Sequence, residues 1–341
     1  MALEHQDERD TVDAKRGDRG APDGRAPDSP GDVSMGGTLK RTFKAFSSDN
    51  LTDWAAALTY YGVQAIFPAL IALVSVIGLV GGNLVSTLTD NVSSVAPGPA
   101  KDILLPAIKN LASSKGAAGI AFIVGLVLAL NSASSYVAAF TRASNSIYDV
   151  EEGRPVWKLK PQQIGIVLVL IIMLVLIVVM VAVSGPLAKE VGKVVGAGSS
   201  AVKIWDIAKI PVVLLIVALM FAFLYKTAPN VKQPGGKFFT PGGFVALFIW
   251  IVASILFALY VAKFASLNKT YGSMGGVIAF LIWLWITNIA ILFGAEFNSE
   301  LQRSQQREAG EAAPLDEPFL EPRDTSKLDK KEKKLDKKEK K

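Results

Sequence analysis

Long uncharged, apolar stretches alternate with short charged segments through the middle of the chain. Charged residues are absent from 54–89, 116–141 and 161–188, and again from 210–225, 238–262 and 270–295. A helix needs about 20 apolar residues to cross the hydrocarbon core of a bilayer. These runs lack the alternation of polar and apolar residues that is typical of barrel strands. The pattern therefore predicts membrane-spanning helices.

We interpret the chain as an all-α integral membrane protein with six transmembrane helices. We place the spans at about residues 55–80, 117–140, 163–184, 207–227, 242–263 and 275–297. The fourth uncharged run is short, and it can span if Lys209 and Lys226 extend outward from its two ends. A single run of this kind could be a buried helix of a soluble protein, but six in succession favour a membrane protein. We divide the chain into a disordered cytoplasmic leader (1–45), the six-helix transmembrane domain (46–302) and a charged cytoplasmic tail (303–341).

Lys and Arg residues near the ends of the spans indicate the orientation, because they gather on the cytoplasmic side. They are slightly more frequent on the side that holds both termini, and Arg303, Arg307 and the lysine-rich end increase the excess. We therefore expect both termini in the cytoplasm. The leader is acidic, without a basic segment followed by a short apolar core, so we expect the first span to serve as an uncleaved signal anchor.

Two segments outside the spans have a regular pattern. Residues 81–116 form the longest connection, on the outer side, and apolar residues recur there at helical spacing on both sides of Pro97-Gly98-Pro99. We expect two short amphipathic helices that rest on the membrane surface, cap a cavity or simply pack over the bundle.

Residues 328–334 and 335–341 repeat the unit Leu-Asp-Lys-Lys-Glu-Lys-Lys. One leucine per heptad gives no coiled-coil seam, so we expect a solvated, disordered tail, with attraction of its lysines to anionic lipid as the alternative.

The composition excludes several classes of protein. Hydrophobic residues make up 51% of the chain and charged residues only 19%, unlike an ordinary soluble enzyme. There is no cysteine and only one histidine, His5, so thiolate metal sites and His-based triads are excluded. No phosphate-binding loop appears, and no carboxylates cluster in the spans. We expect no enzyme activity, metal or cofactor, and the acidic residues of the tail offset its lysines, which disfavours nucleic-acid binding.

Polar side chains inside the spans are the candidates for substrate contacts, because they are costly in lipid. Tyr60 and Gln64 share a face of the first span, beside Tyr61. Asn131, Ser135 and Arg142 follow one face of the second span and continue toward the loop, so that this polar stripe ends in a cation. The alternative is that such residues only join helices by hydrogen bonds.

Further polar residues lie in the fourth and sixth spans. Asp206 and Lys209 are three residues apart and form a candidate ion pair. Asn288 and Glu296 in the sixth span complete the candidate substrate path. Glu296 lies near the end of its span, where it could also serve only as an anchor.

Several short segments follow one another at characteristic spacing over roughly residues 40–302 and include neither tail. They are 51–61, 67–70, 134–145, Tyr148 with 151–155, 184–186, 228–231, 240–242, 268–273, 283–288 and 294–296. In order and spacing, these segments together resemble the YihY/virulence factor BrkB family of bacterial inner-membrane proteins. The resemblance implies a six-helix fold with both termini inside the cell, in the inner membrane. The family has carried the label ribonuclease BN, which the residues here disfavour because they offer no histidine cluster or metal motif.

These observations lead us to expect a transporter, exporter or flippase-like protein for an anionic or amphiphilic envelope substrate. Arg142 would hold an anionic head group, and the polar stripes of the first two spans would line the path. The expected partners are the lipid bilayer and an anionic lipid or amphiphilic small molecule. The alternative is a non-transporting membrane scaffold that recruits partners through the outer loop and the lysine-rich tail. An intramembrane enzyme is a third class, for which the residues nominate no nucleophile.

Overall fold

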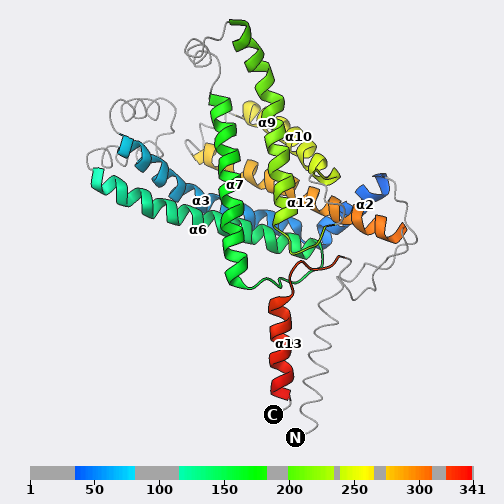
Figure 1. Cartoon of the computed structure of the whole chain (residues 1–341). Coiled ribbons are helices and arrows are strands. Elements are labelled where there is room, and N and C mark those ends of the chain that lie inside the picture. Colours follow the sequence, from blue (N-terminus) through cyan, green and yellow to red (C-terminus); the bar gives the residue numbers. More distant parts are fainter. Residues whose placement is uncertain are drawn as a thin grey trace.

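The computed structural model describes residues 35–80, 115–182, 199–233, 239–264, 274–308 and 320–339. The regular secondary structure of this described part is helical (Figure 1), apart from one isolated bridge between Val231 and Pro322. The helices are α2 (Met35–Ser48), α3 (Leu51–Val80), α6 (Lys115–Ile147), α7 (Val156–Ala182), α9 (Ser199–Thr227), α10 (Pro241–Phe264), α12 (Met274–Glu308) and α13 (Ser326–Glu339).

Five of these helices are long and apolar enough to cross a membrane. The apolar segments are Ile123–Ile147, Val156–Ile177, Ser200–Thr227, Pro241–Val261 and Gly275–Gln306. They confirm the prediction of an all-α membrane protein. The first predicted span, residues 55–80, lies within α3, a continuous helix of 30 residues.

The long helices pack side by side in a closed order. α3 contacts α6, α6 contacts α7, α7 contacts α9, α9 contacts α10, α10 contacts α12, and α12 returns to α3. α12 also contacts α6 and the short helix α2. α12 is therefore the central element of the bundle, and several fully buried polar residues of the described part lie along it.

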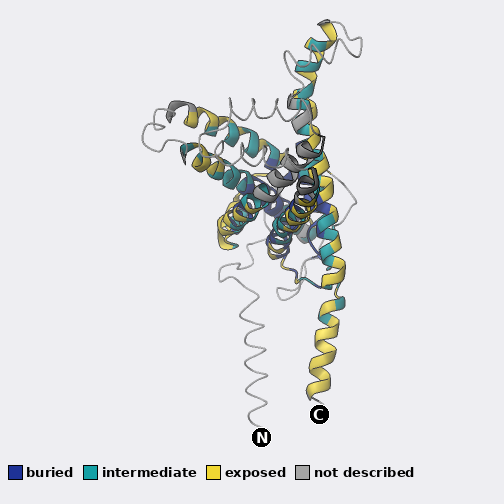
Figure 2. Ribbon diagram, turned by 90° about the vertical axis from the view of Figure 1, so that its left-hand side faces the viewer, coloured by how far each residue is buried: buried dark blue, intermediate teal, exposed yellow. Residues whose placement is uncertain are grey.

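Burial is concentrated at one end of this bundle. Among the residues whose burial is described, most of the buried ones lie in the first halves of α3, α7 and α10 and from the middle onward in α6, α9 and α12. Figure 2 shows these residues where the helices meet, whereas the projecting helical arms are exposed or intermediate. We call this meeting point the closed end, and the opposite halves of the same helices the splayed end. Large apolar side chains remain exposed at the splayed end, among them Ile120, Val127, Ile204, Leu259 and Val277.

The helix order at the closed end follows from local sequence signals. α2 ends before Asn50 and α6 ends before Asp149, and both residues have positive φ, 50° and 52°. Asn and Asp adopt this left-handed conformation more readily than other non-glycine residues, so they suit the ends of helices. α10 begins with Pro241 after Thr240, whose hydroxyl accepts a hydrogen bond from the Gly243 amide at 3.3 Å. A threonine cap followed by proline is a typical helix start.

The boundary of the leader differs from the prediction. Residues 1–45 were expected to be disordered, but α2 begins at Met35 and packs against α12 and α3. Its buried residues, Thr38, Thr42 and Ala45, recur at helical spacing, and Phe43 lies 4.8 Å from the ring of Phe293. The helical domain therefore starts before residue 46, because this short amphipathic stretch has a face to bury. Residues 1–34 lie outside the described part.

The tail also differs from the prediction of disorder over 303–341. α12 continues to Glu308, residues 320–327 dock on the closed end, and α13 follows as a helix. Docking combines backbone bonds, such as Arg323 N to Asn230 O at 2.8 Å and Lys327 N to Gly153 O at 2.8 Å, with side-chain bonds of Asn230 and Arg323. These partners lie far apart along the chain, which is why the docking was missed. The predicted amphipathic helices of residues 81–114 lie outside the described residues.

Candidate functional site

A row of buried polar side chains runs along the second half of α12. These residues are at most 6% exposed although they lie in an apolar helix, and polar groups buried there need hydrogen-bond partners. They are Asn288, Glu296, Asn298, Ser299, Glu300 and Ser304. This row, with the residues that contact it, is the candidate functional site.

Asn288 joins three helices at the start of the row. Its side-chain carbonyl accepts a hydrogen bond from the Tyr136 hydroxyl of α6 at 2.8 Å, and its amide donates to Thr59 Oγ1 of α3 at 3.0 Å. Asn288 was predicted to face a substrate path. The structure buries it completely and satisfies its side chain with neighbouring helices. Its place in a substrate path stays a prediction.

α10 approaches α12 closely where two glycines face each other. A Cβ atom on Gly242 would lie 2.0 Å from the carbonyl oxygen of Gly294, so only glycine fits there. Asn298 secures this contact, because its Oδ1 accepts from the Gly242 amide at 2.8 Å and its Nδ2 donates to Thr240 Oγ1 at 2.8 Å. The start of α10 is thereby fixed on α12.

Glu296 is the most unusual member of the row, because it is an acidic residue with 0% exposure inside a membrane-spanning helix. It was predicted as a substrate-path residue. Its neighbour Tyr148 lies in the loop after α6 and is also buried. Burial raises the pKa of the Tyr148 hydroxyl, and the nearby Glu296 carboxylate raises it further.

Ion pairs lie at the end of the buried row that is nearest to the loops. Arg41 of α2 lies with its Nε 3.5 Å from Glu300 Oε2 and also hydrogen-bonds to Ser304. Arg303 pairs with Asp149, the residue after α6 that has positive φ. These pairs tie α2 and the end of α6 to the same turns of α12.

A second polar cluster, which the sequence analysis missed, lies in the loop between α6 and α7. Arg154 is 4% exposed, and its Nε donates to Glu152 Oε1 at 2.7 Å while another of its nitrogens donates to Ala228 O at 2.9 Å. Asn145 of α6 donates to Glu152 Oε2 at 3.0 Å. Burial alone would raise the pKa of Glu152, but the Arg154 guanidinium outweighs it and lowers this pKa. The segment Glu151–Pro155 was noted only for its family resemblance, although an Arg and a Glu two residues apart were a signal for this pair.

The docked tail segment completes this cluster. Asn230 is fully buried, and its Nδ2 donates to the carbonyl of Asp324 at 2.9 Å while its Oδ1 accepts from the Asp324 amide at 3.1 Å. Lys158 Nζ lies 2.7 Å from Asp324 Oδ2 and lowers the pKa of that carboxyl. A Cβ on Gly153 would lie 1.9 Å from Asp324 O, so the loop and the tail are in direct backbone contact. We call residues 320–327 the strap.

The predicted path residues of the first two spans do not converge on the buried row. Tyr60 is 63% exposed, with its ring 5.4 Å from that of Tyr61, and Gln64 is exposed. Asn131 and Arg142 are exposed as well, whereas Ser135 is partly buried and donates to the Asn131 carbonyl at 3.1 Å. The exposed side chains are open to lipid or to a substrate, and among the described residues no hydrogen bond joins the stripe of α3 to that of α6.

A lysine that the sequence analysis did not select contacts the buried Ser134, next to the polar stripe of α6. Lys160, in the first turns of α7, donates from Nζ to Ser134 Oγ at 2.8 Å. Ser134 in turn donates to the Asn131 carbonyl at 2.9 Å. The cation beside this stripe is therefore Lys160, one helix away from Arg142.

In α9, Lys209 Nζ lies 2.8 Å from Asp206 Oδ1, as an ion pair within one helix.

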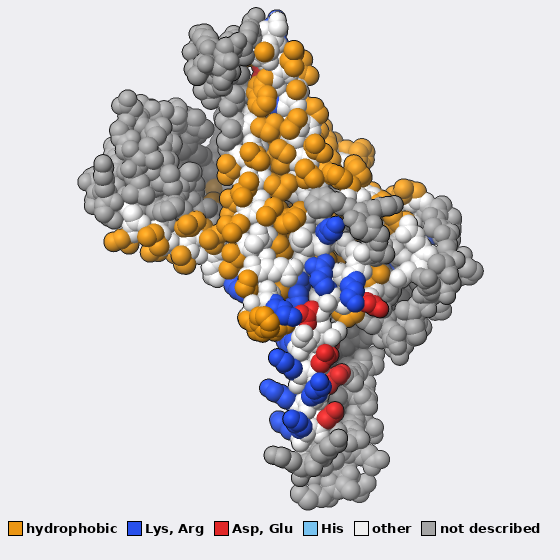
Figure 3. Space-filling view, in the orientation of Figure 1, with side chains coloured by type: hydrophobic (Ala, Val, Ile, Leu, Met, Phe, Trp, Pro, Cys, Tyr) orange, Lys and Arg blue, Asp and Glu red, His pale blue; other side chains and the backbone are white. Residues whose placement is uncertain are grey.

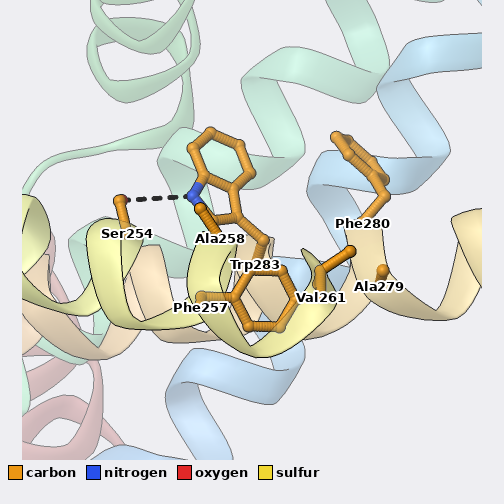
Figure 4. Close-up of a pocket in the computed structure, with 7 residues that line it drawn as sticks. All are labelled: Ser254, Phe257, Ala258, Val261, Ala279, Phe280 and Trp283. Carbon is orange, nitrogen blue, oxygen red and sulfur yellow. Dashed lines mark hydrogen bonds between the residues drawn. The ribbon is translucent and has the colours of Figure 1, made fainter. Parts of the chain in front are cut away.

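The splayed end contains an apolar groove between α10 and α12 (Figure 4) with a volume of about 470 Å³. Figure 4 shows the indole of Trp283 directed toward Ser254, to which its nitrogen donates at 3.2 Å. Phe257 and Phe280 lie on the same groove. Its lining is almost wholly apolar, as a site for an acyl chain requires.

The described residues contain no group of three or more His, Asp or Glu side chains that could hold a metal ion. The buried carboxylate Glu300 of α12 lies beside Arg41 and Arg303, and Glu296 is fully buried one turn before it. The site is therefore a set of helix-joining hydrogen bonds and ion pairs around one deeply buried carboxyl group.

Fold and site together define a bacterial membrane protein made of several apolar helices. Residues 42–317 match the family model described as Virulence factor BrkB, and the chain belongs to this family. The strap begins three residues beyond the matched region.

Curated relatives agree with this assignment. The chain is similar to the ribonuclease-like protein YfkH of Bacillus subtilis, with 28% identity over 272 residues, which are 79% of this chain and 96% of the relative. It is similar to UPF0761 membrane proteins of Alteromonas mediterranea (34% identity, 28% of this chain, 32% of the relative) and Alkalilimnicola ehrlichii (29% identity, 54% and 40%). The chain thus spans less than half the length of these last two relatives. No solved structure matches the chain.

Proposed function

We propose that the protein is a flippase-like exporter that moves an anionic amphiphile across the membrane. The observation that carries this proposal is the contrast between the two ends of the bundle. At the closed end the helices are joined by buried polar contacts, and at the splayed end the same helices leave large apolar side chains exposed. A bundle that is sealed on one side and spread on the other is one state of an alternating-access transporter.

The proposal includes six spans, with α3 as the first, and a closed end that faces the cytoplasm. α2 contacts the end of α12 through Arg41 and Glu300, and the strap that precedes α13 contacts the loop between α6 and α7, so both ends of the described chain lie against the closed end. This arrangement supports two cytoplasmic termini. Lys and Arg side chains gather at the closed end and along α13, whereas apolar side chains cover the helices beyond (Figure 3). This distribution is what the positive-inside rule requires.

The substrate class is inferred from two neighbouring kinds of surface. Lys160 supplies a cation beside Asn131 and Ser134, in reach of an anionic head group. Exposed apolar faces and the groove beside Trp283 suit acyl chains. Charge and chain together indicate an anionic lipid or a similar amphiphile, with Arg142 at the entrance as predicted from the sequence.

Reconstituted vesicles test this proposal directly. Full-length protein in vesicles of phosphatidylethanolamine and phosphatidylglycerol is mixed with phosphatidylglycerol that carries a fluorescent label on its head group, and a reductant bleaches the label in the outer leaflet. We expect protein-dependent movement of labelled phosphatidylglycerol that exceeds movement of labelled phosphatidylcholine. Lys160→Gln should slow the movement of labelled phosphatidylglycerol about tenfold or more, since a charge-assisted contact contributes about 1.5 to 3 kcal/mol.

Lys158→Gln is the matched control, because it removes the same charge from the same helix. Its amine contacts Asp324 of the strap and not the polar stripe. Equal movement of both lipids, or equal rates for the two lysine variants, would contradict the substrate assignment.

A scaffold role is the second candidate, and α13 is the observation that favours it. This helix projects from the closed end with Leu335 53% exposed and with its lysines in solvent (Figure 1). Truncation after residue 319 distinguishes the two functions, because a scaffold loses its partner contacts while a transporter keeps a translocating bundle.

The name of the relative YfkH suggests a ribonuclease, which we do not propose, since the buried row offers no converging carboxylates for metal-assisted cleavage.

A further inference from the structure

We propose that α2 lies in the head-group layer of the membrane and binds anionic lipid there. Its exposed apolar side chains enter the lipid, and Lys40 contacts the phosphates of the head groups. This binding requires no transport activity, so it goes beyond the proposed function. It holds the closed end of the bundle at one surface of the bilayer.

The side of α2 that docks on the protein is polar. Thr38 and Thr42 are both 0% exposed, in a helix that packs on α12 and α3. Their hydroxyls are paired, because Thr42 Oγ1 donates to the Thr38 carbonyl at 2.9 Å and Thr38 Oγ1 accepts from an Arg41 nitrogen at 3.1 Å. Paired hydroxyls can be buried at little cost. The docking face of α2 is therefore a threonine face.

The outer side of α2 is apolar. Met35, Leu39 and Phe43 follow one another at intervals of four residues, and they remain 65%, 39% and 61% exposed. We call these three residues the apolar stripe. A helix at the surface of a soluble protein has the reverse arrangement, with its apolar face inward and its polar face outward. An apolar stripe that faces outward from a helix docked through threonines is what lipid on the outer side requires.

The position of α2 brings the apolar stripe to the edge of the membrane. The ring of Phe43 lies 4.8 Å from that of Phe293, and Arg41 Nε lies 3.5 Å from Glu300 Oε2. Both partners belong to the segment Gly275–Gln306 of α12, which is long and apolar enough to cross a membrane. α2 therefore lies beside the last turns of a membrane-spanning helix, where in-plane amphipathic helices bind at the boundary of head groups and acyl chains.

The start of α7 supports the same boundary. Val156 and Trp157 are 73% and 68% exposed there, and Lys158 Nζ lies 5.3 Å from the centre of the Trp157 ring. Tryptophan gathers where lipid meets water, because its ring is apolar and its N–H group is polar. Lys158 also pairs with Asp324 of the strap, so this tryptophan belongs to the closed end. The closed end thus presents apolar side chains to the head-group layer at two places.

Lysines beside the apolar stripe determine which lipid is bound. Lys40 and Lys44 are one turn apart and exposed, on the side of α2 next to Phe43, and α2 contains no acidic residue. A basic helix with an apolar face is typical of helices that lie on anionic bilayers. A symmetric contact with a second copy of the chain would bring the same lysines against each other, which disfavours that occupant. The charge of α2 therefore favours an anionic lipid surface.

Spin labels test this placement, because the chain contains no native cysteine. Leu39→Cys carries a label on the apolar stripe, and Ser48→Cys carries one on an exposed residue at the opposite side of the same helix. Full-length protein is placed in nanodiscs of phosphatidylcholine and phosphatidylglycerol. Each label is relaxed by oxygen, which concentrates in lipid, or by a water-soluble nickel complex. We expect oxygen to be several-fold more effective, relative to nickel, at residue 39 than at residue 48.

Two outcomes of this measurement would overturn the proposal. A label at residue 39 that nickel reaches as readily as at residue 48 would place the apolar stripe in water. Shielding of residue 39 from both reagents would place it against protein. Dipolar broadening that disappears on dilution with unlabelled protein would then identify a second copy as the occupant.

Brominated lipids test the choice of head group. A fluorophore on Leu39→Cys is quenched by brominated phosphatidylglycerol or brominated phosphatidylcholine, each at the same low fraction in the same lipid mixture. We expect a higher local concentration of phosphatidylglycerol, and Lys40→Gln should reduce this preference about fivefold, as for one lysine near an anionic surface. Lys40→Arg should retain it. Lys232→Gln, which removes an exposed lysine from the loop between α9 and α10, should behave as the parent protein.

Equal quenching by the two lipids in the parent protein, or an unchanged preference in Lys40→Gln, would overturn the binding of anionic lipid by α2. Neither the spin-label nor the quenching measurement requires lipid movement. A protein that gives both expected results but exports no lipid would therefore contradict only the proposed function.

Discussion

At the scale of single residues, Asn288 shows how polar side chains hold this bundle together. It is fully buried and bonds to one residue on each of two neighbouring helices, Tyr136 and Thr59. Hydrogen bonds between membrane helices contribute about 0.6 kcal/mol each on average and up to about 2 kcal/mol. Asn288→Leu should therefore lower the free energy of unfolding by about 1 to 3 kcal/mol, because it also leaves the buried Thr59 and Tyr136 hydroxyls unsatisfied.

The measurement is reversible unfolding of the purified protein in mixed micelles by a denaturing detergent. Tyr136→Phe combined with Asn288→Leu removes both partners of one bond, so the double variant should lose less than the sum of the single losses. Additive losses would show that the two residues do not interact.

Gly242 gives a second prediction at this scale, with a matched control beside it. Gly242→Ala would place a Cβ 2.0 Å from the Gly294 carbonyl and 2.6 Å from the Asn298 side chain, whereas a Cβ on Gly243 meets only Thr240 Oγ1 at 3.5 Å. We expect Gly242→Ala to lower the melting temperature of the protein strongly, since overpacking costs about 1 to 3 kcal/mol. Gly243→Ala should leave it nearly unchanged. Helical circular dichroism during heating checks both, and equal shifts would contradict the close contact.

At the scale of elements, the loop between α6 and α7 depends on an ion pair that titrates. The pKa of Glu152 is lowered by Arg154, so the pair stabilises the folded loop at pH above the ordinary value of 4.5. This contribution is lost as the pH falls through the lowered pKa. Stability of the parent protein should therefore decline between neutral and acid pH. Glu152→Gln should be less stable at neutral pH and should show a smaller decline, and Glu151→Gln should behave as the parent.

Melting temperature as a function of pH measures this effect. Limited proteolysis of the loop between α6 and α7 over the same pH range localises it. A decline in Glu152→Gln as large as in the parent protein would exclude Glu152 as the responsible group.

The strap gives a further prediction about an element. Asn230→Ala removes two side-chain hydrogen bonds to Asp324 and one to the carbonyl of Glu151. The strap should detach more often, so that protease cleaves the chain before α13 several-fold faster, since each bond contributes about 1 kcal/mol. Lys232→Gln removes only the exposed pair with Glu321 and should change the cleavage rate little. Equal cleavage rates in both variants would mean that Asn230 does not hold the strap.

The sequence predicted the helices better than their contacts. Runs of uncharged residues define the spans, because the energy of apolar burial depends on composition and length alone. α2 and the strap were missed because their docking depends on a few buried threonines and on partners far apart along the chain, which leave no strong periodicity. Lys160 was not selected for the same reason, since its partner Ser134 lies on another helix. The Glu152–Arg154 pair is local and had a signal in its spacing, but the Arg154 contact with the Ala228 carbonyl did not.

At the scale of the whole molecule, the proposed export requires two states in exchange, of which the structure with its closed and splayed ends would be one. Arg154 joins the loop after α6 to the end of α9, through Glu152 and the Ala228 carbonyl, and thereby stabilises the closed end. Arg154→Ala should weaken this end and shift the protein toward a state in which the splayed end closes. Spin labels on cysteines at Ile120 of α6 and Ile204 of α9, which are 68% and 66% exposed, report the separation of the splayed arms. We expect two distance populations whose ratio changes about tenfold in Arg154→Ala, since loss of a charge-assisted hydrogen bond costs about 1.5 kcal/mol or more.

Lys158→Gln is the control, because it removes a basic charge near the same loop without breaking the Arg154 contacts. A single distance distribution, identical in all three proteins, would show a rigid bundle and would contradict alternating access.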